Sequence, residues 1–323
     1  MCCVIFSEPT DWSTHDVIDW LVYLKCSYKR IDINSILSSP LNFDFSDNKN
    51  SKIFLNTEIK IEDIHSLWYR RTVPININKY KAKIENNEEL LNSILNHQFD
   101  ELKHTKNAFL NLTSDKKWLN IPATSIIDKT ECLVQAKKCN MIIPETIITN
   151  NKKDLLVFKK KVNKIIVKPI YNITILKDTK YSYLQYTYEL KKNNISKLSD
   201  TFFPTLAQEM IEKEIELRVF FLNGKIYPMA LFSQKNEQTK SDFRRYDYKN
   251  PTRTVPYKLP EDLEVKIRLF MNTVNLNSGS LDFILGKNNI YYFLEVNPVG
   301  QFGMTSYPCN YYIEKDIAKY LNE

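Results

Sequence analysis

The sequence predicts a mixed α/β protein with α+β lobes, and its 323 residues are enough for two or three of them. Three observations predict this class. At the N-terminus, apolar runs at residues 2–6 and 28–33 flank a helical pattern at 13–25 with Ser13 as its expected N-cap, which gives a β-α-β opening. Apolar runs on both sides of Asn223-Gly224 predict a β-hairpin. A second apolar pair at 281–300 flanks a polar turn and predicts another hairpin.

Residues 1–122 are expected to form one α/β lobe, and residues 118–122 read as a linker to the next lobe. Further strands of this lobe are expected at residues 52–55, 57–61 and 66–71. A long amphipathic helix is expected at 88–106, because its apolar residues recur at helical spacing. We expect these residues to face the core: Leu90, Leu91, Ile94, Leu95, Phe99 and Leu102.

The rest of the chain alternates helical and strand-like patterns. Helices are expected at residues 125–139, 154–161, 261–274 and 311–321. Strands are expected at residues 145–149, 165–169, 217–222 and 227–233, with a further hairpin at 171–190. The charged segment 240–247 has no apolar period and is expected to be a loop.

Composition limits the classes of function. The net charge is +7, because 45 Lys and Arg outnumber 38 Asp and Glu. This excess fits an anionic ligand such as a nucleotide or an acidic peptide, and no nucleic-acid motif is present. The chain has only five glycines, which excludes a Walker or dinucleotide fingerprint as the nucleotide site.

Six cysteines occur without a C-x-x-C pair. We expect free thiols in a reducing compartment rather than disulfides or zinc. No signal peptide is recognised, and no apolar run approaches the roughly 20 residues of a membrane helix. The sequence therefore predicts a soluble, cytoplasmic protein without a membrane partner.

Three oxygen-bearing side chains stand out in the last predicted hairpin. Glu295 and Asn297 are two residues apart on one strand, so they share a face, and the hairpin folds Asp282 back toward them. Two carboxylates and an amide oxygen suit Mg²⁺, which is usually held by one or two carboxylates plus nucleotide phosphates. The alternative is a hairpin with polar residues on its wet face. The apolar residues around these three side chains favour the metal site over the solvated hairpin, because carboxylates inside a buried strand pair need a partner.

Other charged residues allow two interpretations each. Lys168 ends an apolar strand before Pro169, where it either projects into a site or extends to water. Only one of Arg70 and Arg71 can face a given cleft, since neighbours on a strand point to opposite sides. The Arg forks of the 240–247 loop can hold an acidic substrate, or the loop is simply solvated.

Three motifs together resemble the ATP-grasp superfamily: K-P at 168–169, Q-E-M-I-E-K-E-I-E-L-R at 208–218, and D…E-V-N at 282–297. Within it the chain looks like the graspetide synthetases, the microviridin-type and grasp-with-spasm peptide maturases. The closer match lies in W-Y-R-R, E-L-R, D-F-R-R-Y-D and N-P-V-G-Q-F-G. The resemblance covers nearly the whole chain and is weakest at residues 34–60 and 171–199.

The resemblance implies an ATP-grasp fold with a pre-ATP-grasp domain at 1–122, a central lid domain at 123–205 and an antiparallel-sheet domain at 206–323. It also implies roles for single residues. Lys129 and Lys168 match the lysines that hold ATP phosphates. Glu209 matches the acid that reads the adenine amino group, with the backbone of Met210 and Ile211 beside it, and Glu216 matches the acid that binds the ribose.

Further roles follow from the same resemblance. Asp282, Glu295 and Asn297 match the Mg²⁺ ligands, and Arg218 matches an arginine near the transferred phosphate. The segment thought to engage the core peptide corresponds to Arg244, Arg245 and Asp247. One departure concerns the phosphate-covering loop, which usually bears glycine, whereas residues 171–180 have none.

The implied reaction is ATP-dependent activation of Asp or Glu side chains of a precursor peptide as acyl-phosphates. A Ser or Thr hydroxyl, or a Lys amine, of the same peptide then closes an ω-ester or ω-amide ring, and the match favours esters. The implied partners are ATP, Mg²⁺, a peptide with a leader and an acidic, Thr-rich core, and a second copy in a homodimer. Two alternatives stay open: a ligase that adds a free amino acid to a protein tail or small molecule, and a non-catalytic scaffold.

Overall fold

The computed structural model describes residues 2–32, 40–46, 51–55, 57–71, 87–171, 175–178, 180–184, 187–233 and 252–323, and it divides into two compact units. The first unit combines Met1–Ser125 with Tyr312–Glu323, and the second is Ile126–Tyr311. The three-domain division stays a prediction. None of the described helices combines the length and apolar character that crossing a bilayer requires.

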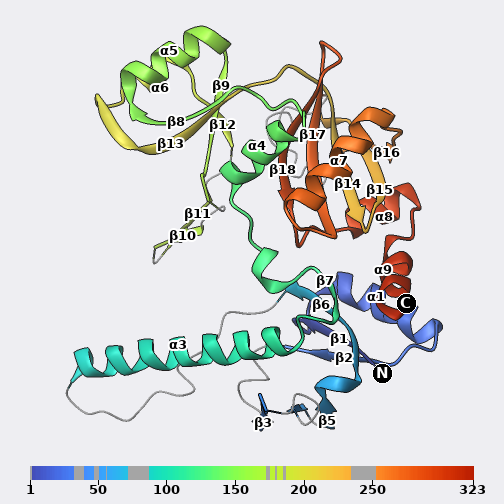
Figure 1. Cartoon of the computed structure of the whole chain (residues 1–323). Helices are drawn as coiled ribbons and strands as arrows, with labels where there is room; N and C mark the ends of the chain where they lie inside the picture. Colours follow the sequence, from blue (N-terminus) through green and yellow to red (C-terminus); the bar gives the residue numbers. More distant parts are fainter. Residues whose placement is uncertain are drawn as a thin grey trace. The chain divides into compact units, whose positions relative to one another are not determined.

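The first unit is built on a four-stranded sheet in the order β2-β1-β6-β7, and all its neighbouring strands run parallel (Figure 1). A small antiparallel sheet, β3-β4-β5, belongs to the same unit. The strands are β1 (Cys2–Ser7), β2 (Tyr28–Ile31), β3 (Leu41–Asn42), β4 (Lys52–Leu55), β5 (Thr57–Lys60), β6 (Ile64–Arg71) and β7 (Lys117–Leu119). The helices are α1 (Trp12–Tyr23), α3 (Glu88–Leu112) and α9 (Ile313–Asn322).

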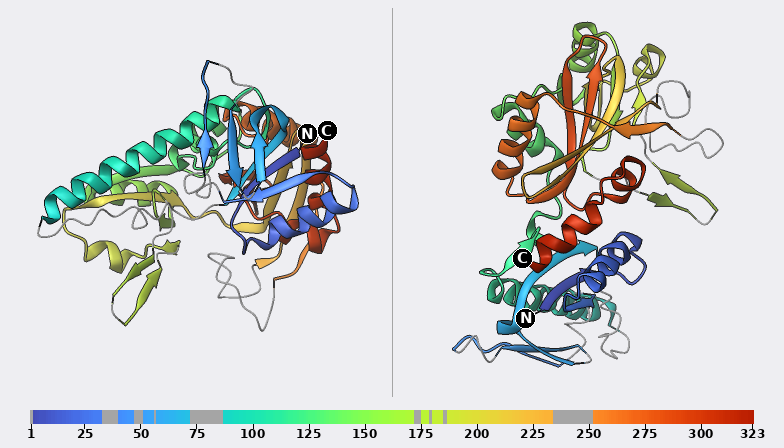
Figure 2. Two further views of the ribbon diagram at one scale, coloured as in Figure 1. Left: turned by 90° about the horizontal axis from the view of Figure 1, so that it is seen from below. Right: turned by 90° about the vertical axis from the view of Figure 1, so that its right-hand side faces the viewer.

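Helices cover both faces of the parallel sheet. On one face Phe6 stacks on Trp118 and meets Phe109 of α3 edge-on. On the other face the Ser66 hydroxyl donates to the carbonyl of Leu321, which ties α9 to β6. Helix α9 also packs along α1, and Figure 2 shows the two helices side by side in both views. The last helix of the chain therefore completes the N-terminal unit.

The second unit contains two antiparallel sheets, in the orders β16-β15-β14-β17-β18 and β12-β9-β13-β8. A separate hairpin pairs β10 (Ile175–Lys177) with β11 (Ser182–Leu184). The strands of the two sheets are β8 (Thr146–Asn151), β9 (Ile165–Lys168), β12 (Tyr188–Glu189), β13 (Thr201–Glu209), β14 (Lys213–Leu222), β15 (Lys225–Leu231), β16 (Thr254–Pro256), β17 (Ser278–Gly286) and β18 (Tyr291–Asn297). The helices are α4 (Lys129–Lys138), α5 (Lys152–Val162), α6 (Lys192–Ser196), α7 (Glu261–Thr273) and α8 (Gly303–Cys309).

Each sheet of the second unit has one helix-covered face. Helices α4 and α7 bury apolar residues against the five-stranded sheet, among them Phe270, which packs on Phe293. Helices α5 and α6 cover the four-stranded sheet with Phe158 and Ile195. The other face of the five-stranded sheet is left to polar side chains and to α8, whose preceding residue Phe302 packs on Phe220. The face of the five-stranded sheet that α4 and α7 leave uncovered contributes to the candidate site.

Several predicted elements are confirmed. The hairpin at Asn223-Gly224 connects β14 to β15, and both turn residues have positive φ, 43° and 89°, as a two-residue turn of this kind requires. The hairpin at 281–300 is β17 paired with β18. The lysine-ending strand at 165–169 is β9, and the predicted hairpin at 171–190 contains β10 and β11.

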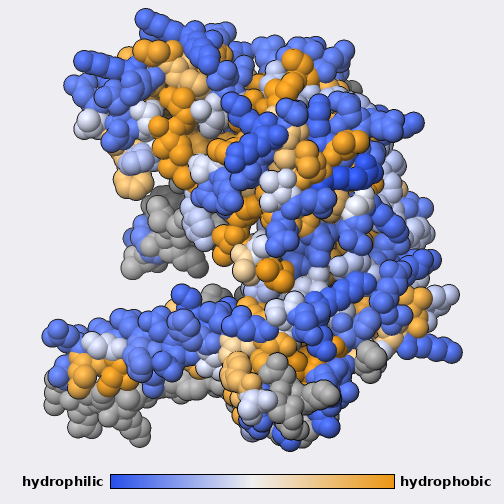
Figure 3. Space-filling model, viewed as in Figure 1, coloured by the Kyte–Doolittle hydropathy of each residue, from blue (hydrophilic) through white to orange (hydrophobic). Residues whose placement is uncertain are grey.

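Three predictions about the first unit were wrong. Residues 118–122 are not a plain linker, because Trp118 and Leu119 are buried in β7. Helix α1 is capped by Asp11, not Ser13, and the Asp11 carboxylate accepts from the backbone N–H of Ser13. Most of the predicted core face of α3 is not buried, since Leu90 and Phe99 are 48% and 41% exposed. Figure 3 shows mainly hydrophilic side chains on the visible face of α3, with an apolar patch toward its N-terminal end.

Candidate functional site

The second unit contains a cavity between its two sheets. The four-stranded sheet lines it with the ends of β9 and β13, and the five-stranded sheet lines it with β14, β17 and β18. The connection between β13 and β14, which crosses from one sheet to the other, lies along the same cavity. Seven of the residues that the sequence predicts for the site line the cavity: Lys168, Glu209, Met210, Ile211, Glu216, Asp282 and Glu295.

A row of charged side chains crosses the five-stranded sheet. Arg218 of β14 is opposite Asp282 of β17, and Asp282 is opposite Glu295 of β18. Directly opposite residues of antiparallel strands project from the same face of the sheet. Arg218 Nε lies 3.8 Å from Asp282 Oδ1, and the two side chains are only 10% and 16% exposed. The two carboxylates are therefore neighbours, with the positive charge of the arginine beside Asp282.

A β-bulge gives Glu295 its direction. The register shifts between Asp282 and Phe283, so that Phe283 pairs with Phe293 while Asp282 pairs with Glu295, and Leu294 is the extra residue. Phe293 belongs to the core on the helix-covered face. Without the bulge, strict alternation along the strand would put Glu295 on that same core face, because Glu295 is two residues after Phe293. The bulge instead turns Glu295 to the cavity side.

Glu216 is a buried acid with two donors. Its Oε1 accepts from the Lys213 ammonium and from the Ser233 hydroxyl. The side chains of Lys213 and Glu216 are 10% and 9% exposed, so the ion pair is shielded from bulk water. Because a buried carboxylate is costly without a partner, Lys213 and Ser233 account for the burial of Glu216. Neither Lys213 nor Ser233 was among the predicted site residues, although the sequence carried a signal, because an acid in an apolar strand requires a nearby cation.

The connection between the sheets is held by backbone hydrogen bonds. The N–H of Glu209 donates to the Glu145 carbonyl over 2.8 Å, and the N–H of Met210 donates to the Lys164 carbonyl over 2.9 Å. The Glu209 carboxylate lies 3.4 Å from the N–H of Glu145. Since the Met210 N–H is already used, Met210 can offer a ligand its carbonyl oxygen and side chain, while Ile211 lines the cavity beside it.

The two predicted lysines lie in different places. Lys168 is the last residue of β9 and lines the cavity. Lys129 is the first residue of α4 and is not among the residues that line the cavity. Asp128 caps this helix by accepting from the N–H groups of Thr130 and Glu131 at 2.8 and 2.9 Å. Hydrogen bonds from the Thr130 hydroxyl and from the backbone hold the pKa of Asp128 below its usual value.

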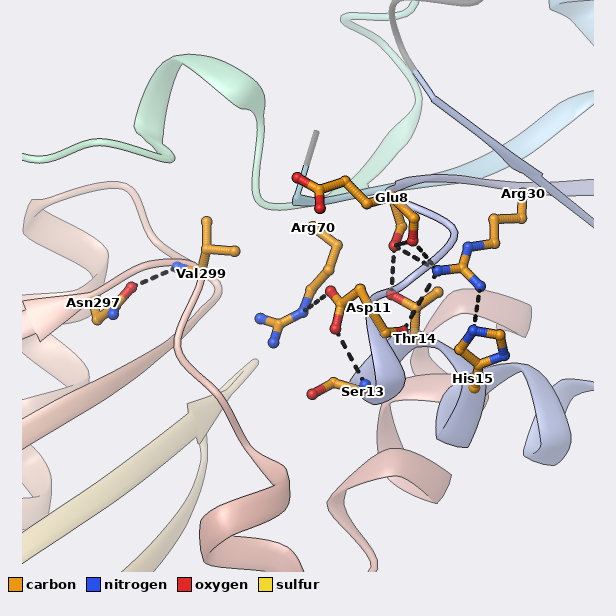
Figure 4. A network of polar contacts seen from close by, with 10 residues as sticks. Glu8, Asp11, Ser13, Thr14, His15, Arg30, Arg70, Asn297 and Val299 are labelled. Carbon is orange, nitrogen blue, oxygen red and sulfur yellow. Dashed lines mark hydrogen bonds and ion pairs between the residues drawn. The ribbon is translucent and has the colours of Figure 1, made fainter. Parts of the chain in front are cut away.

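Asn297 extends the polar row by one position. It is opposite Ser280, two residues beyond Glu295, and therefore projects from the same face. Its Oδ1 accepts from the N–H of Val299 over 3.2 Å (Figure 4). A carbonyl oxygen has two lone pairs, so this bond leaves it able to bind a cation.

The donor set fits Mg²⁺. Among the residues that the structure describes, no three His, Cys, Asp or Glu side chains form a metal cage. Asp282 and Glu295 supply two carboxylates, and Asn297 supplies an amide oxygen. A site with one or two carboxylates suits Mg²⁺ because this ion takes its remaining ligands from water and phosphates.

Buried Cys132 lies close to this set, on the helix-covered side. Burial raises the pKa of its thiol to about 12, and the nearby carboxylates of Glu131, Asp128 and Glu295 add to the effect. A thiol with such a pKa is protonated at neutral pH and is therefore not a nucleophile.

The W-Y-R-R motif lies in the first unit. Arg70 is 3% exposed, and its Nε donates to the Asp11 carboxylate over 3.1 Å, as Figure 4 shows. Asp11 thus caps α1 and binds Arg70 at the same time. The described part of the structure does not include the side chain of Arg71. Arg244, Arg245 and Asp247 also lie outside the described residues.

The fold of this chain occurs in known structures. A Chryseobacterium gregarium RiPP-associated ATP-grasp ligase, in complex with ADP and a leader and core peptide, superposes with a TM-score of 0.82 at 22% identity, over 99% of this chain and 95% of the other. This chain has the ATP-grasp fold. The macrocyclase MdnC from Microcystis aeruginosa MRC, bound with the precursor peptide MdnA, gives 0.79 at 22% identity, over 99% of both chains.

A third structure with the ATP-grasp fold is the ligase PsnB, complexed with a phosphomimetic variant of a minimal precursor, Mg and ADP. It gives a TM-score of 0.76 at 15% identity, over 99% of this chain and 97% of PsnB. No protein-family model matches the sequence, and no curated protein matches it. The similarity to these ligases is therefore detected in the fold, and the sequence motifs predicted this fold.

Proposed function

We propose that this chain is an ADP-forming ATP-grasp ligase that links side chains within a ribosomally made precursor peptide. The observation that carries the proposal is the cavity between the two sheets. Lys168, Glu209 and Glu216 of the predicted nucleotide site line this cavity. Asp282 and Glu295 of the predicted metal site line it too. The similar structures named above hold ADP, Mg or precursor peptides, which supports the same use of the cavity here.

The proposed roles are those of the ATP-grasp residues that these positions match. Glu209, with Met210 and Ile211, contacts the adenine, and Glu216 contacts the ribose. Lys168 holds phosphates, and Lys129 is proposed to do so from the start of α4. Mg²⁺, when bound at Asp282, Glu295 and Asn297, supplies positive charge that neutralises the phosphates.

Arg218 is proposed to stabilise charge on the transferred phosphate. A carboxylate oxygen of a peptide Asp or Glu attacks the γ-phosphorus, the bond to ADP breaks, and an acyl-phosphate forms. Positioning and electrostatics dominate such transfers. A hydroxyl or amine of the same peptide then attacks the acyl carbon, loses its proton and releases phosphate. Arg244, Arg245 and Asp247 are proposed to hold the acidic core.

The test is incubation of the full-length protein with ATP, Mg²⁺ and the precursor peptide encoded beside its gene. Tandem mass spectrometry is expected to show loss of one water mass per link, together with ADP formation. An unchanged peptide would count against the proposal. A mass increase by an amino acid would point instead to the ligase that adds a free amino acid.

The kind of link can be read in the same experiment. We propose ω-esters between Asp or Glu and Ser or Thr. Hydroxylamine cleaves esters and leaves amides intact, so treated product is expected to lose its rings. Rings that survive the treatment would assign ω-amides to Lys.

We further propose three lobes, at residues 1–122, 123–205 and 206–323, and a homodimer. Light scattering coupled to size-exclusion chromatography is expected to give twice the 38.2 kDa mass of the chain. All six cysteines are free, which supports a reducing cytoplasm as the site of action.

A further inference from the structure

Glu216 presents its two carboxylate oxygens to different surroundings. Oε1 accepts both the Ser233 hydroxyl and the Lys213 ammonium. Oε2 receives no hydrogen bond from any residue within the described ranges, and Glu216 lines the cavity. One oxygen is therefore fixed by the protein, and the other is left for a ligand.

Ser233 is placed to fix the rotation of this carboxylate. Strand β15 ends at Leu231, the cross-strand partner of Glu216, and Ser233 lies two residues beyond it. Ser233 is 1% exposed and its hydrogen bond to Glu216 is buried, so water does not compete for it. Lys213 supplies the compensating charge, but an ammonium on a flexible stem is a weaker directional constraint than a buried hydroxyl.

We infer that Ser233 is a positioning residue that holds Glu216 so that Oε2 accepts hydrogen bonds from the ribose hydroxyls of the nucleotide. The inference rests on the proposed function and adds a residue to it. Ser233 does not touch the nucleotide and acts only through Glu216. The consequence is selectivity: a correctly turned carboxylate favours a ribose with both hydroxyls over a deoxyribose.

The test is equilibrium binding of Mg²⁺ with ADP, 2′-deoxy-ADP or 3′-deoxy-ADP, measured by calorimetry on the full chain. Wild type is expected to prefer ADP over at least one deoxy analogue by about tenfold, as for a hydrogen bond to a charged group. Ser233→Ala is expected to reduce this ratio to about two- or threefold. Ser233→Thr, which keeps the hydroxyl, is expected to retain it.

Ser306→Ala is the matched control, because Ser306 is also 1% exposed in the second unit but does not line the cavity. It is expected to keep the wild-type ratio. A purely structural role for Ser233 would weaken binding of all three nucleotides equally, so the ratio separates the two roles. If Ser233→Ala does not fold, Ser233→Cys keeps the size and replaces the hydroxyl by a weak donor.

Each outcome decides between the two proposals. A wild type that binds no ADP overturns the proposed function and this inference with it. A wild type that binds ADP and both analogues equally overturns only the inference. A Ser233→Ala variant that keeps the wild-type preference for ADP over the deoxy analogues also overturns only the inference. The same holds for Ser233→Cys where that variant is measured instead.

Discussion

Single charged residues carry most of the proposed chemistry, and Asp282 lies between two of them. It faces Arg218 on one side and Glu295 on the other. Its charge therefore lies beside the arginine and is also proposed to bind the metal ion. Replacing Asp282 with Asn keeps the shape of the side chain and removes its charge, so the effect of the charge can be measured without a change in packing.

We expect Asp282→Asn to lower ADP formation in the presence of precursor peptide and Mg²⁺ by at least about 100-fold, the scale of losing one electrostatic contact to a transition state. The melting temperature, measured in parallel, is expected to show that the variant still folds. Asp262→Asn is the control, because Asp262 is 69% exposed in α7. Near-wild-type turnover in Asp282→Asn would show that Asp282 is not a metal ligand.

Asp128 gives a prediction about pH. Its pKa is lowered in the folded state by hydrogen bonds from Thr130 and Glu131, so its stabilising effect is present above the unfolded pKa of about 4 and is lost as pH falls through the folded pKa. We expect Asp128→Ala to cost about 1 kcal/mol of unfolding free energy at pH 7, as for a lost helix cap. Denaturant titrations should show this difference shrinking in acid, whereas Asp128→Asn keeps a cap that does not titrate. A pH-independent difference would contradict the assignment.

At the scale of the element, α3 is longer than the sheet that it covers. Its 25 residues span about 37 Å, whereas the 8 residues of β6, the longest strand of the sheet, span about 26 Å. Only its C-terminal part, with Phe109 and Leu112, is buried. Apolar periodicity identifies the inner face of such a helix, but it does not tell how far the sheet extends beneath it.

Two phenylalanines of α3 test this description. Phe109 is fully buried and Phe99 is 41% exposed, so the same substitution is expected to have different costs. Phe109→Ala is expected to lower the free energy of unfolding by about 3–5 kcal/mol, and Phe99→Ala by less than about 1. Equal losses in urea denaturation would show that the N-terminal half of α3 is also packed.

The end of the β17–β18 pair depends on a close approach at Gly300. A Cβ on Gly300 would lie 2.2 Å from the Ser280 hydroxyl oxygen and 2.5 Å from the Ser280 Cβ. Gly300→Ala is expected to cost about 1–3 kcal/mol, the range for overpacking. Adding Ser280→Gly removes both clashing atoms and is expected to restore part of the melting temperature. If the melting temperature of the double variant does not recover, the contact with the Ser280 side chain is not the cause of the destabilisation.

Much of the site was predictable, and the missing parts have physical reasons. The 281–300 hairpin brought Asp282 to Glu295 as expected. The bulge at Leu294 was not foreseen, because Leu294 continues the apolar run of residues 291–293, and one more apolar residue in such a run leaves no mark on the pattern. Lys213 and Ser233 were missed because their importance arises from one buried acid, not from a motif. Strand β7, with three residues, is too short to show a period.

At the scale of the whole molecule, α9 connects the end of the chain to its beginning. Residues Ile313, Ile317 and Leu321 are at most 1% exposed and pack within the first unit. The N-terminal unit therefore depends on residues that come after the entire second unit in sequence.

We expect Ile317→Asp in the full chain to destabilise the first unit by about 3 kcal/mol or more, because it buries a charge. Hydrogen exchange is expected to rise in α1 and β6. Lys319→Asp changes the exposed face of the same helix and serves as the control. Unchanged protection of α1 in Ile317→Asp would show that α9 is not part of the first unit.

The position of α9 also has a consequence for biosynthesis. The ribosome emits residues 126–311 as one uninterrupted segment, so this unit has all its own residues before α9 appears. Strands β1, β2 and β6, although translated before that segment, have to wait for Ile313–Asn322 to leave the exit tunnel before their sheet is covered on both faces. The nascent polypeptide therefore completes its first unit only after it has made the second.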